Sequence, residues 1–181
     1  LREVYYGLDC QMLLYLFTLE RNGGHLFSQG TAAGVEYLWA DPAPENIIRP
    51  ETDDAEPLQA QNYPLEGLLL DEPSIYHAMD TRGTGAFVPL SFSAKTGEPT
   101  AQSAKARLAD REKFNRIRDH LDGMLTDMAK NLYSGEIDAA PLVPNAGKSP
   151  CLWCEYRTVC RHADGEGERT PLKPDDPFGT E

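Results

Sequence analysis

The chain has 181 residues, of which 40% are hydrophobic and 25% are charged, a balance typical of one soluble globular domain. Its formal net charge of −12 argues against broad nucleic-acid binding, because duplex affinity depends largely on Lys and Arg that neutralise phosphates. Charged and polar residues interrupt the opening apolar run well short of the roughly 18 apolar residues that a membrane span requires. We therefore expect a cytoplasmic protein without a membrane segment.

Acidic residues are concentrated in 41–80, which holds ten of them against Arg49 alone. Within this stretch, 41–64 is predicted to be an acidic loop or insertion. Residues 147–162, which hold three cysteines, carry three basic residues against one acid. Residues 163–181 are rich in Gly, Pro and acids without apolar periodicity, and we expect this tail to be disordered.

The first half of the chain predicts alternating helices and strands. Apolar residues at spacings of three and four from Tyr5 to Leu19 indicate one amphipathic helix that ends near Asn22. Residues 32–39 indicate a strand, and 67–70 form a second short apolar run. Further on, the pattern favours a helix over 73–79 and another strand over 86–92.

The longest predicted element begins after Asp110, a good N-cap, and ends at Ser134 and Gly135. One apolar stripe runs along it, and we expect this stripe to pack on a sheet or on the first helix. Its members are Phe114, Ile117, Leu121, Leu125, Met128 and Leu132.

Cys151, Cys154 and Cys160 lie within ten residues, at a spacing typical of metal ligands. Structural zinc and cubane iron–sulfur clusters normally need four protein ligands. The fourth ligand would be Cys10, a histidine such as His162, or a residue outside this chain. The alternative is that the three thiols are buried or form disulfides.

Gln11 and Tyr15 are four residues apart, which places them on one face of the predicted helix, within an otherwise apolar sequence. A polar amide in that setting needs a partner. The simplest interpretation is a hydrogen-bonded structural Gln beside a core Tyr.

The segment from Gly7 to Tyr15 resembles the Q-x-x-x-Y motif of RecB-type nucleases in the PD-(D/E)XK superfamily. Cys151-x2-Cys154-x5-Cys160 resembles the three C-terminal ligands of the iron–sulfur staple found in some of them. Both features occur in compact Cas4-like nucleases and in the B subunit of AddAB-type helicase–nucleases, and the segments 65–80 and 134–141 are more similar to the latter. The resemblance covers 1–162 and implies a mixed α/β fold, the C-terminal portion of a restriction-endonuclease-like nuclease domain.

The resemblance implies a role for each matching residue. Gln11 would hydrogen-bond a phosphate or base near the scissile position, and Tyr15 would support the catalytic Lys or stack near the DNA strand. The three clustered cysteines would hold a structural 4Fe–4S cluster, with a fourth cysteine upstream of this chain and Cys10 as a packed core thiol. The family's Mg²⁺-binding Asp and acid-x-Lys strand precede Q-x-x-x-Y. The chain contains no acid-x-Lys triplet, so we expect the catalytic strands to be missing and the chain alone to be inactive.

For the intact protein, the resemblance implies a Mg²⁺-dependent deoxyribonuclease. It would cut one DNA strand while an AddA-type helicase–nuclease partner unwinds DNA from a double-strand break, which prepares ends for recombinational repair. For the chain alone we expect poor cluster binding and self-association through an uncovered helix face formed by Leu8, Met12, Leu16 and Leu19.

Two alternatives stay open. One is a Cas4-like iron–sulfur single-strand exonuclease that acts alone. The other is a non-enzymatic zinc-binding interaction module in which His162 joins Cys151, Cys154 and Cys160.

Overall fold

The computed structural model describes residues 1–25, 30–38, 65–143, 149–160, 162, 167–171 and 176–179. The chain divides into two compact units. One unit is Tyr15–Phe114, and the other combines Leu1–Leu14 with Asn115–Glu181. Each unit has buried side chains of its own and is considered by itself.

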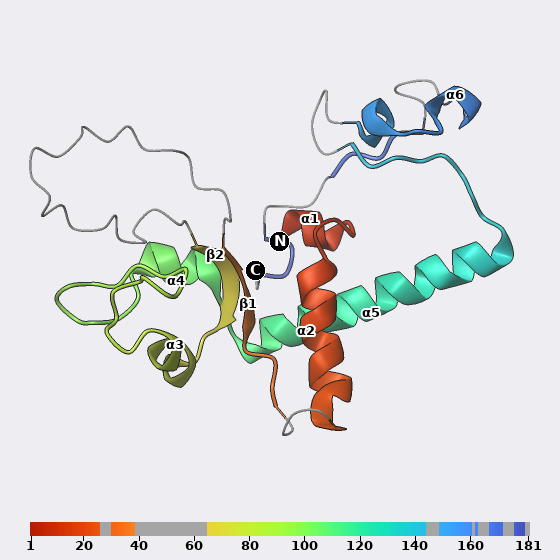
Figure 1. Cartoon of the computed structure of the whole chain (residues 1–181). Helices are drawn as coiled ribbons and strands as arrows, with labels where there is room; N and C mark the ends of the chain where they lie inside the picture. Colours follow the sequence, from red (N-terminus) through yellow and green to blue (C-terminus); the bar gives the residue numbers. More distant parts are fainter. Residues whose placement is uncertain are drawn as a thin grey trace, which may run out of the picture. The chain divides into compact units, whose positions relative to one another are not determined.

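The described residues form both helices and short strands, which confirms the mixed α/β class (Figure 1). In chain order the elements are α1 (Arg2–Tyr5), α2 (Gln11–Asn22), the 3-10 turn η1 (Gly23–His25), β1 (Gly34–Leu38), β2 (Leu65–Leu70), α3 (Pro73–Met79), α4 (Ala101–Arg107), β3 (Leu108–Ala109), α5 (Arg111–Ser134), the 3-10 turn η3 (Pro150–Trp153) and α6 (Arg157–Cys160).

A three-stranded sheet in the order β1-β2-β3 forms the centre of the unit Tyr15–Phe114. β1 and β2 are antiparallel with Gly34 opposite Leu69, and β2 and β3 are parallel with Leu69 opposite Leu108. Leu68, Leu69 and Leu70 are consecutive and all buried, so both faces of the central strand are covered. The strand predicted within 32–39 is confirmed as β1, and the short apolar run at 67–70 lies within β2.

One hydrophobic cluster joins this sheet to the segments that follow it. It contains Leu69 of β2, Tyr76 of α3 and Leu108 of β3, together with Val88 and Leu90 from the segment between α3 and α4. Phe92 and Ala104 pack against the cluster from its edge. The core therefore fixes the loop after α3 as well as the helices.

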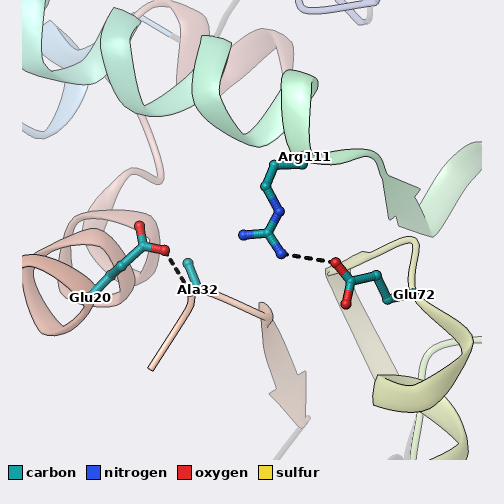
Figure 2. Close-up of polar contacts among 4 residues, drawn as sticks. All are labelled: Glu20, Ala32, Glu72 and Arg111. Carbon is teal, nitrogen blue, oxygen red and sulfur yellow. Dashed lines mark hydrogen bonds and ion pairs between the residues drawn. The ribbon is translucent and has the colours of Figure 1, made fainter. Parts of the chain in front are cut away.

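Polar contacts fix the start of α5. The Asp110 carboxylate accepts a 2.7 Å hydrogen bond from the amide of Lys113, which confirms the predicted N-cap. Arg111 forms a 2.9 Å ion pair with Glu72, which precedes α3 (Figure 2). In the same unit, Glu20 accepts a 2.8 Å hydrogen bond from the amide of Ala32 (Figure 2). The Arg111–Glu72 pair is about half exposed, so its contribution to stability is small, about 0–1 kcal/mol.

The predicted stripe on α5 is buried over only its first half. Ile117 and Leu121 are almost fully buried, whereas Leu125 and Leu132 are 42% and 73% exposed. The helix itself continues to Ser134, where Gly135 ends it with a φ of +78°. The apolar pattern thus predicted the helix correctly and its burial only in part.

Aromatic contacts organise the second unit. The Tyr5 ring stacks on the His120 ring with centroids 4.4 Å apart, and His120 Nε2 lies 2.8 Å from the Tyr5 carbonyl oxygen. Phe178 is buried beside both rings, and Arg116 donates a 3.0 Å hydrogen bond to its carbonyl. These contacts join α1, α5 and part of the C-terminal tail.

The predicted opening helix is corrected to two helices. Residues 6–10 separate α1 from α2, with Gly7 at a φ of +87° and Asp9 at +53°. A Cβ on Gly7 would also lie 3.1 Å from the sulfur of Met124. Glycine is therefore favoured here because it adopts the positive φ easily and leaves room for this sulfur. The apolar period from Tyr5 to Leu19 does not reveal this break because Leu8 keeps the apolar spacing across it.

Two further predictions between α3 and α5 are corrected. Residues 86–92 do not form a strand, and only Phe92 pairs there, in an isolated bridge with Pro99. Pro89 lacks an amide hydrogen, so the segment is held by its buried side chains and not by a ladder. Sequence reasoning also missed α4, whose N-cap is Thr100 and whose alanines give no strong apolar stripe.

The expectation of a disordered tail applies to 163–181, of which the structure describes two parts. Arg169 pairs with Leu142 in an isolated parallel bridge, and Phe178 is buried. Both described parts are therefore held by contacts. The predicted acidic loop 41–64 and the rest of the tail lie outside the described residues. No helix within the described part of the chain combines the length and apolarity needed to cross a membrane.

Candidate functional site

Gln11 and Tyr15 both lie on α2, one turn apart. Gln11 is the first residue of the helix, and both side chains are exposed, Tyr15 to 55%. The spacing of four places them on one helix face, as the sequence predicted. The exposure of Tyr15 differs from the simple interpretation of a core tyrosine, and it makes this face accessible.

The start of α2 has a chemical consequence. The carbonyl of Cys10 accepts a 2.9 Å hydrogen bond from the amide of Leu14, which begins the helical ladder. The backbone amides of the first turn have no partner within a helix, and the helix dipole gives this end a partial positive charge. Gln11 therefore lies at the end of a helix that favours anions such as phosphate.

Cys10 is a packed thiol. Its side chain is 7% exposed, and its sulfur lies within hydrogen-bonding distance of the carbonyl oxygens of Val4 and Leu8, at 3.5 and 3.3 Å. Burial raises the pKa of this thiol, and the negative charge of Asp9 raises it further. Cys10 is thus protonated at neutral pH, in agreement with the predicted role of a core residue.

The segment with Cys151, Cys154 and Cys160 is open to solvent. All three thiols are free, Cys151 is half-buried, and the other two are exposed. The Ser149 hydroxyl accepts a 3.3 Å hydrogen bond from the amide of Cys151, and the amide of Cys160 donates to the carbonyl of Tyr156 at 2.8 Å. The first of these hydrogen bonds lies at the start of η3 and the second lies in α6, so each is local to its own element.

The donor chemistry of these cysteines suits zinc or iron, but the geometry does not gather them. Across the residues that the structure describes, no three His, Cys, Asp or Glu side chains form a group that could hold a metal ion. His162, the alternative fourth ligand, has a buried Nε2 without a hydrogen-bond partner in that same part of the chain. The residues fit an iron–sulfur cluster or zinc by type alone. The same finding applies to Mg²⁺, for which the described residues present no ligand set.

Sequence reasoning missed the loop 80–86, which follows α3. Asp80 is 1% exposed, and its carboxylate accepts hydrogen bonds from the Thr84 hydroxyl and from the amides of Arg82, Gly85 and Ala86. The signal available in the sequence was an Asp followed by two glycines within five residues. These hydrogen bonds hold the loop around one buried carboxylate.

Comparison with known proteins identifies the family. A sequence profile of the PD-(D/E)XK nuclease superfamily matches residues 1–161. Similar curated proteins include one from Symbiobacterium thermophilum, 31% identical over 166 residues, and one from Thermoanaerobacter sp. (strain X514), 30% identical over 168 residues. A third, from Exiguobacterium sibiricum, is 29% identical over 166 residues.

Each of the three relatives carries the name of one subunit, designated B, of an ATP-dependent helicase/deoxyribonuclease. The alignments cover 88–89% of this chain but only 14% of each relative, so the chain spans about one seventh of their length. The superfamily match includes both α2 and the segment with the three clustered cysteines. The chain therefore belongs to the PD-(D/E)XK nuclease superfamily.

Proposed function

We propose that this chain is the supporting part of a deoxyribonuclease domain in a longer protein, the B subunit of a helicase–nuclease. The observation that carries the proposal is the superfamily match over 1–161, which includes Gln11 and Tyr15 on one exposed face of α2. The relatives' names, which denote helicase/deoxyribonuclease subunits, support the same class of activity. They favour this assignment over a Cas4-like nuclease that acts alone.

In this proposal the longer protein resects DNA ends at double-strand breaks for recombinational repair, together with an AddA-type helicase–nuclease partner. Phosphodiester hydrolysis in this family uses Mg²⁺, which supplies charge stabilisation and an activated water when bound. No residue of this chain is assigned as a ligand of that metal. The chain's own contribution is to position DNA.

Gln11 provides this positioning in two ways. Its side-chain amide carries both donors and an acceptor, so it can hydrogen-bond a phosphate oxygen or a base edge. Its place at the N-terminal end of α2 adds backbone amides and a partial positive charge for a phosphate. Tyr15, one turn further on, limits how a strand can lie against this face. Such positioning groups raise the rate without taking part in bond breaking.

We also propose that Cys151, Cys154 and Cys160 bind a 4Fe–4S cluster with a fourth cysteine elsewhere in the longer protein. When bound, the cluster would link distant parts of the chain and stabilise the fold. Iron together with acid-labile sulfide in the longer protein is the expected analysis. One zinc per chain without sulfide would contradict the cluster and favour the zinc module with His162.

Cleavage assays of the chain and of the longer protein test the proposed function. With Mg²⁺ or Mn²⁺, the longer protein should cut single-stranded DNA, and the isolated 181 residues should not. Cleavage that co-purifies with the isolated chain and disappears on Asp9→Asn would contradict the proposal, because a complete catalytic centre would then lie within this sequence.

A further inference from the structure

A shallow hollow of about 470 Å³ lies on the surface of the unit Tyr15–Phe114. One part of its lining comes from the end of α3 and the following loop, with His77, Thr81 and Arg82. The other part comes from the segment 92–97, with Phe92 and Ser93. Its volume is within the range of about 300–1,000 Å³ that is typical of small-ligand sites.

The side chains that line the hollow favour an anion. Arg82 carries a permanent positive charge, and no carboxylate belongs to the described lining. Over the described ranges, the Arg82 guanidinium forms no ion pair. The hydroxyls of Thr81 and Ser93 add hydrogen-bond donors. Arg82 is thus the one Lys, Arg, Asp or Glu side chain in the described lining of the hollow.

Phe92 adds an aromatic surface beside these polar groups. Its ring is half-buried, packs at the edge of the core cluster, and also lines the hollow. The His77 ring lies 6.2 Å from it, centroid to centroid, with an angle of 31° between the planes. A planar ligand can stack on such rings, because every nucleobase has a π-face.

The hollow is built on fixed backbone. The buried Asp80 carboxylate accepts hydrogen bonds from the amides of Arg82, Gly85 and Ala86. These bonds fix the backbone of the loop that carries Arg82. Asp80 is only 1% exposed, and its carboxylate oxygens already accept these hydrogen bonds. On the other side, the amide of Gly97 donates to the Ser93 carbonyl at 2.8 Å, which closes the 92–97 segment.

Phosphate and base recognition are combined in this arrangement. A guanidinium with nearby hydroxyls suits a phosphate, and an aromatic ring next to it suits the attached base. A shallow hollow of this size does not accommodate a duplex, whose bases are already stacked. We propose that the hollow binds one phosphate–base unit of single-stranded DNA, and the proposal rests on the nuclease function proposed above.

Binding of a fluorescein-labelled oligothymidylate of about ten nucleotides to the 181-residue chain tests the proposal, measured by fluorescence anisotropy with EDTA so that nothing is cleaved. Arg82→Ala should weaken binding about 10-fold and reduce the slope of log K against log salt by about 0.7, the value for one lost phosphate contact to a single strand. Phe92→Leu keeps the apolar packing but removes the stacking surface. It should weaken binding about 5-fold without changing the slope.

Lys105→Ala is the matched control. It removes the same unit charge from an exposed side chain of the same unit, outside the hollow, and should change the affinity less than about 2-fold. Circular dichroism and thermal unfolding of each variant establish that it is folded. Inorganic phosphate and thymidine monophosphate serve as competitors.

Equal weakening by Lys105→Ala and Arg82→Ala would overturn the proposal, because binding would then follow overall charge. Unchanged binding by both Arg82→Ala and Phe92→Leu would overturn it as well. So would tight binding of phosphate or of the mononucleotide without binding of the strand. The nuclease function is judged separately, by cleavage in the longer protein, and it survives any of these results if that cleavage depends on Gln11.

Discussion

The Asp80 carboxylate accepts a 2.7 Å hydrogen bond from the backbone amide of Gly85, and this bond lies inside the fold, with Asp80 only 1% exposed. Gly85 has a φ of +74°, and a Cβ there would collide with the carbonyl of Leu90. Burial acts to raise the pKa of Asp80. Hydrogen bonds from the Thr84 hydroxyl and from three amides outweigh it, so the pKa lies below the ordinary 3.8.

Asp80→Asn should therefore destabilise the protein by about 2–4 kcal/mol, because buried amide donors lose their charged acceptor. Urea unfolding at pH 7 measures the change. Asp127→Asn is the control, since that side chain is 72% exposed and its loss should cost less than about 1 kcal/mol. Equal effects of the two substitutions would contradict the structural role of Asp80.

The same carboxylate predicts a pH dependence. A carboxyl group with a lowered pKa stabilises the fold fully above its unfolded-state value, near pH 4, and this contribution is lost as pH falls through the lower folded-state value. The stability difference between wild type and Asp80→Asn should thus be constant from about pH 6 to 8 and shrink below about pH 4. A difference that grows on acidification would contradict the hydrogen-bonded carboxylate.

The two ends of the apolar stripe on α5 should respond differently to truncation. Leu121 is 1% exposed and Leu132 is 73% exposed. Leu121→Ala should lower the free energy of unfolding by about 2–5 kcal/mol through lost burial and a cavity, and Leu132→Ala by less than about 0.5 kcal/mol. Denaturant unfolding of the two variants compares them directly. A large loss at Leu132 would mean that the second half of α5 packs against a surface, such as another copy of the chain.

The four cysteines should differ in reactivity. Cys10 is buried, and burial together with the charge of Asp9 raises its pKa, whereas Cys154 and Cys160 are exposed. Because the thiolate is the reactive form, the exposed thiols should react with a disulfide reagent at least about 10-fold faster than Cys10 at pH 7.5. Cys10→Ser should remove the slowest phase alone. Equal rates at all four positions would show that the packing around Cys10 opens readily.

The strength of local patterns decided how much of the fold was predictable. Asp110, an apolar period and a terminal glycine specified α5, whereas the run of consecutive leucines indicated an apolar segment that the structure shows to be β2. The break between α1 and α2 depends on the left-handed conformations of Gly7 and Asp9, which apolar spacing does not encode. The segment 86–92 has the composition of a strand, but Pro89 and tertiary packing give it another form.

The candidate site was predictable in a similarly uneven way. The spacing of Gln11 and Tyr15 predicted their shared helix face, whereas their functional role was suggested by the resemblance to the Q-x-x-x-Y motif. Cys151, Cys154 and Cys160 were found by spacing, but local backbone bonds alone do not gather them around a metal. The hollow beside Arg82 joins segments 77–83 and 92–97, and only tertiary contacts bring these together.

DNA cleavage by the longer protein with Gln11→Ala tests the central claim most directly, namely that this chain positions DNA for a nuclease. The initial rate on a single-stranded end should fall about 10- to 100-fold through loss of a positioning contact, while unwinding by the partner helicase is unchanged. Thr18→Ala, an exposed substitution on the same helix, should leave the rate within about 2-fold of wild type. Full cleavage activity in the Gln11→Ala protein would contradict the account.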